Sequence, residues 1–205
     1  GYFQENTYIL WDETKECVII DPGNTTNEED AILFDFIQKH QLKPVRLLLT
    51  HGHIDHIAGN DAVFTKYGLL PEVHKEDLFL IQAHEWTAKM YGILCTPSPL
   101  PNSFIQDKST IRFGNSTLYT LHTPGHSPGS ITYYSPEHQF AIVGDVLFYE
   151  SIGRTDLPKG DFETLKRSIH TKLFTLPDNT IIYSGHGPKT TIGHEKRFNP
   201  FVAII

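Results

Sequence analysis

The sequence is poor in the residues that build disulfide-stabilised domains and membrane spans. Its 205 residues include only two cysteines, Cys17 and Cys95, which are far apart and have neither a zinc-binding nor a redox spacing. We therefore expect two reduced thiols in a cytoplasmic protein. The sequence also lacks any apolar run near the ~18 residues that a membrane-spanning helix needs, so a membrane protein is not expected.

Positive charge is also scarce. The chain has 17 lysine and arginine residues against 24 aspartate and glutamate residues, a formal net charge of −7, and no run of basic side chains. Such a surface repels a phosphate-rich polymer, so nucleic acid is not an expected partner. The composition, 39% hydrophobic and 20% charged, is that of a globular protein. The length predicts a single domain, residues 1–205.

Histidine, by contrast, is abundant, with 12 residues, and three of these fall in one loop with an aspartate. The loop follows an apolar run that is typical of a buried strand. Imidazole nitrogen and carboxylate oxygen suit zinc, iron or manganese, and the missing thiolate argues against a closed structural zinc site. Neighbouring side chains diverge, so the alternate residues His51 and His53 can converge on one ion. Asp55 and His56 are then left for a second ion.

The second half of the chain repeats this placement of ligand-type residues after strands. Three predicted strands are each followed by such a residue: His126, Asp145 and His186. Strands are predicted in hairpins in each half, and helices follow them. We therefore expect an α/β protein in which two mixed sheets pack face to face, with helices outside and the site along one edge.

Helices and loops between these strands have their own signals. Helices are predicted over residues 27–40, 60–67, 76–91 and 162–174. Thr26 and Glu29 form a capping box at the start of the first helix. The proline-dense segment Thr96–Asn102 has the composition of a domain linker or of a stiff internal loop. Because no linker composition continues beyond it, we predict the internal loop.

These ligand-type residues match the pattern T-H-x-H-x-D-H, followed at a distance by H, D and H. The sequence therefore resembles the metallo-β-lactamase superfamily, and the resemblance runs from about Asn6 to Phe201. It implies a four-layer αββα sandwich. It also implies one divalent ion on His51, His53 and His126, and another on Asp55, His56 and His186. Asp145 would bridge the two ions, which are expected to be zinc, with iron or manganese as alternatives.

Within the superfamily, the chain looks most like the glyoxalase II-like hydrolases, which cleave acyl thioesters of glutathione such as S-lactoylglutathione. The motifs that carry this likeness are Asp21-Pro22-Gly23, Gly144–Phe148, Gly153–Asp156 and Asn199–Phe201. The longer enzymes of this group have an additional C-terminal helical region and a lysine where this sequence has Arg154. The short bacterial type is therefore the better match. β-Lactam hydrolysis is not expected, because common zinc β-lactamases have a cysteine at the position of Asp145.

The resemblance and the chemistry together predict a binuclear hydrolase of small acyl thioesters, with Asp55 and Asp145 as catalytic carboxylates. A thiolate leaves readily, so the reaction needs no separate strong acid. Tyr149 and Arg154 follow the Asp145 loop and are predicted to contact substrate, although Arg154 could equally pair with Asp156. Two other readings are a persulfide dioxygenase with one iron on the first histidine set, and a non-catalytic metal-binding module.

Overall fold

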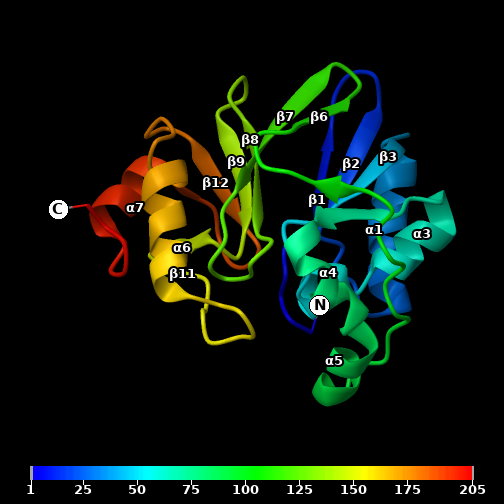
Figure 1. Ribbon diagram of the computed structural model, residues 1–205. Helices are drawn as coiled ribbons and strands as arrows, with labels where there is room; N and C mark the ends of the chain where they lie inside the picture. Colours follow the sequence, from blue (N-terminus) through cyan, green and yellow to red (C-terminus); the bar gives the residue numbers. More distant parts are fainter. Residues whose placement is uncertain (1, 205) are drawn as a thin grey trace.

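The computed structural model describes residues 2–204 and contains two β-sheets that face each other (Figure 1). The first sheet has the order β1-β2-β3-β4-β5. Its strands are β1 (Tyr8–Trp11), β2 (Glu16–Ile20), β3 (Lys43–Leu48), β4 (Pro71–His74) and β5 (Phe104–Ile105). The second sheet has the order β13-β12-β9-β8-β7-β6. Its strands are β6 (Thr110–Phe113), β7 (Ser116–His122), β8 (Ile131–Ser135), β9 (Phe140–Gly144), β12 (Ile181–Ser184) and β13 (Thr190–Thr191).

Helices cover the outer face of each sheet (Figure 1). On the first half of the chain these are α1 (Asn27–Lys39) and α3 (Asn60–Tyr67). This half also contains α2 (Ile54–Ile57), α4 (Leu78–Gln82) and α5 (His84–Tyr91), and α5 lies below the sheets in Figure 1. On the second half they are α6 (Phe162–Ser168), extended by a π-helical turn (Ile169–Leu173), and α7 (Ile192–Phe198). The short ribbon of β10 (Leu147–Phe148) and β11 (Ser151–Ile152) precedes α6.

Strand β2 shows why the layers form. It is apolar and buried on both faces, as expected for a strand between two layers. Val18 and Ile20 point into the space between the sheets, where they pack with residues such as Tyr133 and Ile142. Ile19, on the opposite face, packs against α1. A third cluster joins α6 and its π-helical turn to the second sheet. The predicted αββα sandwich is therefore confirmed.

Strand direction brings the ligand-type residues to one edge of the sandwich. In the first sheet, β2 and β3 are parallel, with Ile20 opposite Leu48. In the second sheet, β9 and β12 are parallel, with Ser184 opposite Gly144. The loops that follow these strands therefore begin at the same end of their sheets. The backbone amide of Ile131 donates to the carbonyl of Thr50 (2.7 Å), which joins the two halves there.

Most predicted elements are present, with two differences. The predicted helix 76–91 is wrong as a single element, because the segment forms a 3₁₀ turn (Lys75–Asp77), α4 and α5, with a break at Ala83. The Asp77 side chain is drawn into the core by hydrogen bonds instead of continuing a surface helix. The Thr26 hydroxyl caps α1 as predicted, but the Glu29 carboxylate accepts from the amide of Thr25. No helix within residues 2–204 is long and apolar enough to cross a membrane.

Candidate metal centre

The loop from His51 to His56 changes conformation at His53, where helix α2 (Ile54–Ile57) begins. Its ligand-type side chains therefore point in two different directions. His53 has an extended backbone and occupies the N-cap position of the short helix α2. Asp55 and His56 lie on that helix, whereas His51 lies in the preceding loop. His51 and His56 are almost completely buried. The local fold therefore separates the two pairs in the way that the sequence predicted.

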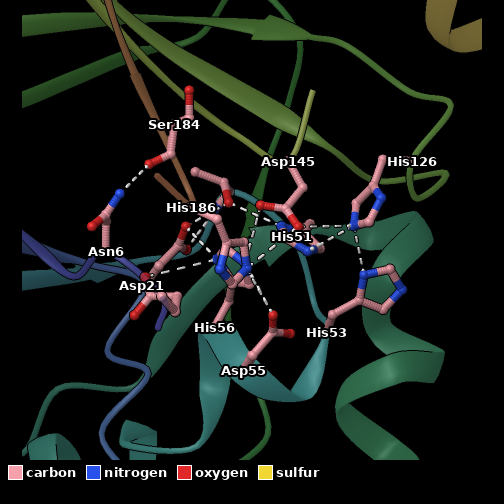
Figure 2. A network of polar contacts seen from close by, with 12 residues as sticks. Asn6, Asp21, His51, His53, Asp55, His56, His126, Asp145, Ser184 and His186 are labelled. Atoms are coloured by element: carbon pink, nitrogen blue, oxygen red, sulfur yellow. Dashed lines mark hydrogen bonds and ion pairs between the residues drawn. The ribbon is translucent and has the colours of Figure 1, made fainter. Parts of the chain in front are cut away.

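The first cluster contains the imidazoles of His51, His53 and His126 (Figure 2). His126 Nε2 lies 2.8 Å from His53 Nδ1 and 3.2 Å from His51 Nε2. The rings meet almost at right angles, with interplanar angles of 82–85°. Three ring nitrogens therefore converge on one point, which is the arrangement of a three-histidine metal site.

The second cluster contains two carboxylates and two imidazoles: Asp55, His56, Asp145 and His186. His186 Nε2 lies 3.0 Å from Asp55 Oδ2, and His56 Nε2 lies 3.3 Å from Asp145 Oδ1. The other oxygen of Asp145 lies 3.6 Å from His126 Nε2, which belongs to the first cluster. Asp145 therefore stands between the two clusters, as Figure 2 shows.

Unsatisfied atoms in the clusters indicate that cations belong there. Within residues 2–204, His56 Nε2 and Asp145 Oδ1 are buried in the second cluster and have no hydrogen-bond partner. A buried polar atom without a partner costs free energy, and a coordinated cation removes this cost. Each cluster also offers only nitrogen and oxygen donors, within 4.8 Å of one another. The residues present therefore fit a pair of divalent ions.

The electrostatic environment differs between the two clusters. Burial and the neighbouring imidazole of His126 lower the pKa of His53 to about 3, so its ring is neutral at neutral pH. Burial favours the neutral form of Asp145, but the adjacent His56 holds the pKa of this carboxyl below its usual value. Burial also disfavours charge on His56, yet the carboxylates of Asp55 and Asp145 raise the pKa of that ring. The second cluster thus attracts positive charge.

Residues outside the clusters orient the ligand rings. Asp21 Oδ2 lies 3.0 Å from His56 Nδ1, and Asp21 also accepts hydrogen bonds from the amide and hydroxyl of Thr50. His126 Nδ1 donates to the carbonyl of Arg154 (2.8 Å). Because each Nδ1 is held by an oxygen, the Nε2 lone pair is directed into the site.

Glycine is required where Gly185 approaches the second cluster. A Cβ atom at this position would lie 2.2 Å from Asp145 Oδ1 and 2.5 Å from the His56 ring. Any other residue would therefore displace two ligand-type side chains. The backbone of Gly185 also accepts a hydrogen bond from the amide of Asn6, which brings the N-terminal segment beside the site.

Comparison with known proteins agrees with this geometry. The model of the metallo-beta-lactamase superfamily matches residues 1–186. The chain belongs to the metallo-β-lactamase superfamily. It is 41% identical to the hydroxyacylglutathione hydrolase GloC of Haemophilus influenzae, over 98% of this chain and 93% of that protein.

Two solved structures from the comparison are similar over nearly the whole chain. The crystal structure of the BLEG-1 B3 metallo-beta-lactamase has a TM-score of 0.90 and 39% identity, covering 98% of this chain and 96% of that one. The crystal structure of TTHA1623 in a di-iron-bound form has a TM-score of 0.88 and 37% identity, with the same coverage. The superfamily fold thus accommodates two metal ions in a similar protein.

The resemblance to the superfamily did not assign roles to three buried carboxyl residues near the site. Asp21 entered the sequence analysis only as part of the motif Asp21-Pro22-Gly23, yet it contacts His56. Glu5 lies 4.0 Å from His56, and burial raises its pKa to about 9. Asp77 contacts the loops of the first cluster. Only Asp21 had a sequence signal, its position directly after a strand, because the other contacts join distant segments.

The two predicted substrate residues lie on the chain after Asp145. The Tyr149 ring is half-exposed and stacks on His194, with centroids 5.0 Å apart. The Arg154 guanidinium makes two parallel hydrogen bonds to Asp156, of 2.7 and 2.8 Å. Arg154 therefore pairs with Asp156, and the side chains of Arg154 and Asp156 remain largely exposed. The substrate role of Tyr149 and Arg154 stays a prediction.

Proposed function

We propose that this protein is a binuclear metal-dependent hydrolase of small acyl thioesters. The observation that carries the proposal is the position of Asp145, whose carboxylate lies between a three-histidine cluster and a second cluster of His and Asp residues. One carboxylate shared by two cation sites is the arrangement of binuclear hydrolytic centres. The 41% identity to a hydroxyacylglutathione hydrolase supports the thioester class.

Each cluster has a distinct role in this proposal. His51, His53 and His126 would hold one ion, and Asp55, His56 and His186 the other, with Asp145 shared. Divalent ions bound there supply an activated water at neutral pH and polarise the substrate carbonyl. Zinc fits the nitrogen and oxygen donors, and the di-iron form of a similar protein supports iron as the alternative.

The chain's own residues supply orientation and charge. Asp145 places negative charge beside both clusters, while Asp21 and the Arg154 carbonyl fix the rings of His56 and His126. With Asp55 and Asp145 used as ligands, these carboxylates are not free to act as general acids. A thiolate leaves without protonation, whereas an amine needs a proton donor. This difference favours thioesters over amides as substrates.

The proposal predicts hydrolysis of S-lactoylglutathione and related thioesters by the metal-loaded protein. Thiol release should be measured alongside metal content, with chelator-treated protein as the control. The same preparation should be given glutathione persulfide, with oxygen uptake followed, and a chromogenic β-lactam. Oxygen uptake without thioester cleavage would instead identify a persulfide dioxygenase. Cleavage of the β-lactam alone would favour an activity like that named for the B3 relative.

We further propose that Arg154 binds an anionic part of the substrate. The protein carries a net charge of −7, so an anionic substrate needs a local cation. Arg154→Ala should raise KM and leave kcat little changed, because binding common to substrate and transition state is lost. The pair with Asp156 is exposed to solvent, which weakens it, so the melting temperature should change little.

Asp156→Ala is the matched variant for this prediction. It removes the same ion pair and leaves the guanidinium free, so it should not raise KM. If Arg154 only braces the loop, both variants should instead lower the melting temperature and the metal content. A normal KM in Arg154→Ala would rule out the substrate role.

A further inference from the structure

Asp77 is a completely buried carboxylate at the end of the 3₁₀ turn that follows β4. Its Oδ2 accepts hydrogen bonds from the backbone amide of Gly52 (3.0 Å) and the hydroxyl of Ser127 (2.7 Å). Its Oδ1 accepts from the backbone amide of Gly129 (2.6 Å). Three donors from two distant loops thus meet on one side chain.

The residues that donate these hydrogen bonds are neighbours, in the sequence, of the histidines of the first cluster. Gly52 lies between His51 and His53, and Ser127 directly follows His126. Asp77 therefore joins the two loops that together provide the first cluster. Its hydrogen bonds go to atoms beside the ligands rather than to the ligand nitrogens.

The two loops lie close against Asp77 and its helix. A Cβ atom at Gly129 would lie 2.6 Å from Asp77 Cγ, and one at Gly52 would lie 2.9 Å from the Cβ of Leu80. The backbone amides reach the carboxylate because these positions have no side chain. The distance between the loops is thus set by one small group in a tightly packed space.

We propose that Asp77 is a positioning residue that sets the distance between the His51–His53 loop and His126, and thereby the affinity of the first metal site. The inference rests on the proposed binding of an ion by these three histidines. It concerns how the site is held together and not which reaction it performs.

A carboxylate suits this position because it only accepts hydrogen bonds. An asparagine has nearly the same size, but its NH₂ group would face the backbone amide of either Gly52 or Gly129. That amide would then lose its hydrogen bond, and its loop would be held less firmly against the other. Replacing a group that supports metal ligands typically weakens metal binding by about 10- to 100-fold.

The test measures metal affinity in Asp77→Asn by competition with a chromophoric chelator of known affinity. We expect the first ion to bind about 10- to 100-fold more weakly and the second ion to bind as in the wild type. The same substitution is also made in a His56→Ala background, which is expected to keep only the first ion. Weaker binding in that background shows that the first ion is the one affected. The absorption spectrum of the Co²⁺-loaded variant should also change, because the three imidazoles are held less firmly.

Glu195→Gln is the matched control. Glu195 is also completely buried and accepts three hydrogen bonds, from Glu150, Thr190 and Asn199, but these partners lie outside the first cluster. The Glu195→Gln variant should lower the stability of the fold without changing the affinity for the first ion. If both variants weaken that affinity equally, the effect is general destabilisation and the inference is wrong.

Ser127→Ala provides a second variant in case Asp77→Asn does not fold. It removes one of the three donors. It should therefore also lower the affinity for the first ion, but by less than Asp77→Asn. Unchanged affinity for the first ion, in Asp77→Asn if it folds and otherwise in Ser127→Ala, overturns the inference even when the wild type binds two ions. A wild type that binds no ion contradicts the proposed function itself, and the inference with it.

Discussion

The Asp145→Asn variant is expected to lose thioester hydrolysis by several orders of magnitude while keeping its fold. Asp145 approaches His56 in one cluster and His126 in the other, so its charge serves both sites at once. Asparagine keeps the shape and one oxygen but removes the negative charge. A loss of three orders of magnitude would correspond to about 4 kcal/mol of transition-state stabilisation.

The measurement compares kcat and kcat/KM for thiol release, with metal content determined on the same samples. Asp35→Asn is a suitable control, because Asp35 is an exposed aspartate on α1. A large fall in kcat at normal metal content would support a role for the charge in the reaction. An Asp145→Asn enzyme with unchanged turnover would refute the proposed mechanism.

The second large effect is expected in the number of bound ions. His56→Ala should lose the ion of the second cluster and keep the first, because its partners are Asp55, Asp145 and His186. His51→Ala should weaken the other ion instead. Metal analysis of protein purified without added chelator should therefore give close to one equivalent for His56→Ala and two for the wild type.

His138→Ala is the control for this comparison, since His138 is an exposed histidine that follows β8. It should bind metal as the wild type does. If His56→Ala still binds two equivalents, the assignment of His56 to the second ion is wrong. If the wild type binds a single ion on the first cluster, the mononuclear alternative gains support.

The ligand-type residues could be predicted because their signal is local. His51 to His56 form a compact motif after a strand, and His126, Asp145 and His186 each follow another strand. The structure brings all of them into two adjacent clusters. Strand direction explains why they lie together. Strands β9 and β12 are parallel, and β7 runs in the same direction as β9 because β8 is antiparallel to both, so the residues that follow these strands lie at the same edge of the sheet.

Contacts between distant segments could not be predicted in the same way. Asp77 lies in a stretch with helical spacing, and the sequence predicted an uninterrupted helix there. Its hydrogen bonds to Gly52 and Gly129 depend on loops 25 and 52 positions away. For Arg154 the sequence left open a substrate anion and Asp156 as partners, and the structure shows the pair with Asp156.

The division of ligand-type residues between the two halves of the sandwich also affects the stability of the fold. Each cluster takes residues from both halves, His51 and His53 with His126 on one side, and Asp55 and His56 with His186 on the other. Ions bound there would cross-link the halves. They would also couple folding to metal supply, because a ligand that binds only the native state stabilises it in proportion to the logarithm of its concentration. Separation of the halves would dismantle both sites together, so the protein's lifetime in a cell would depend on the availability of metal.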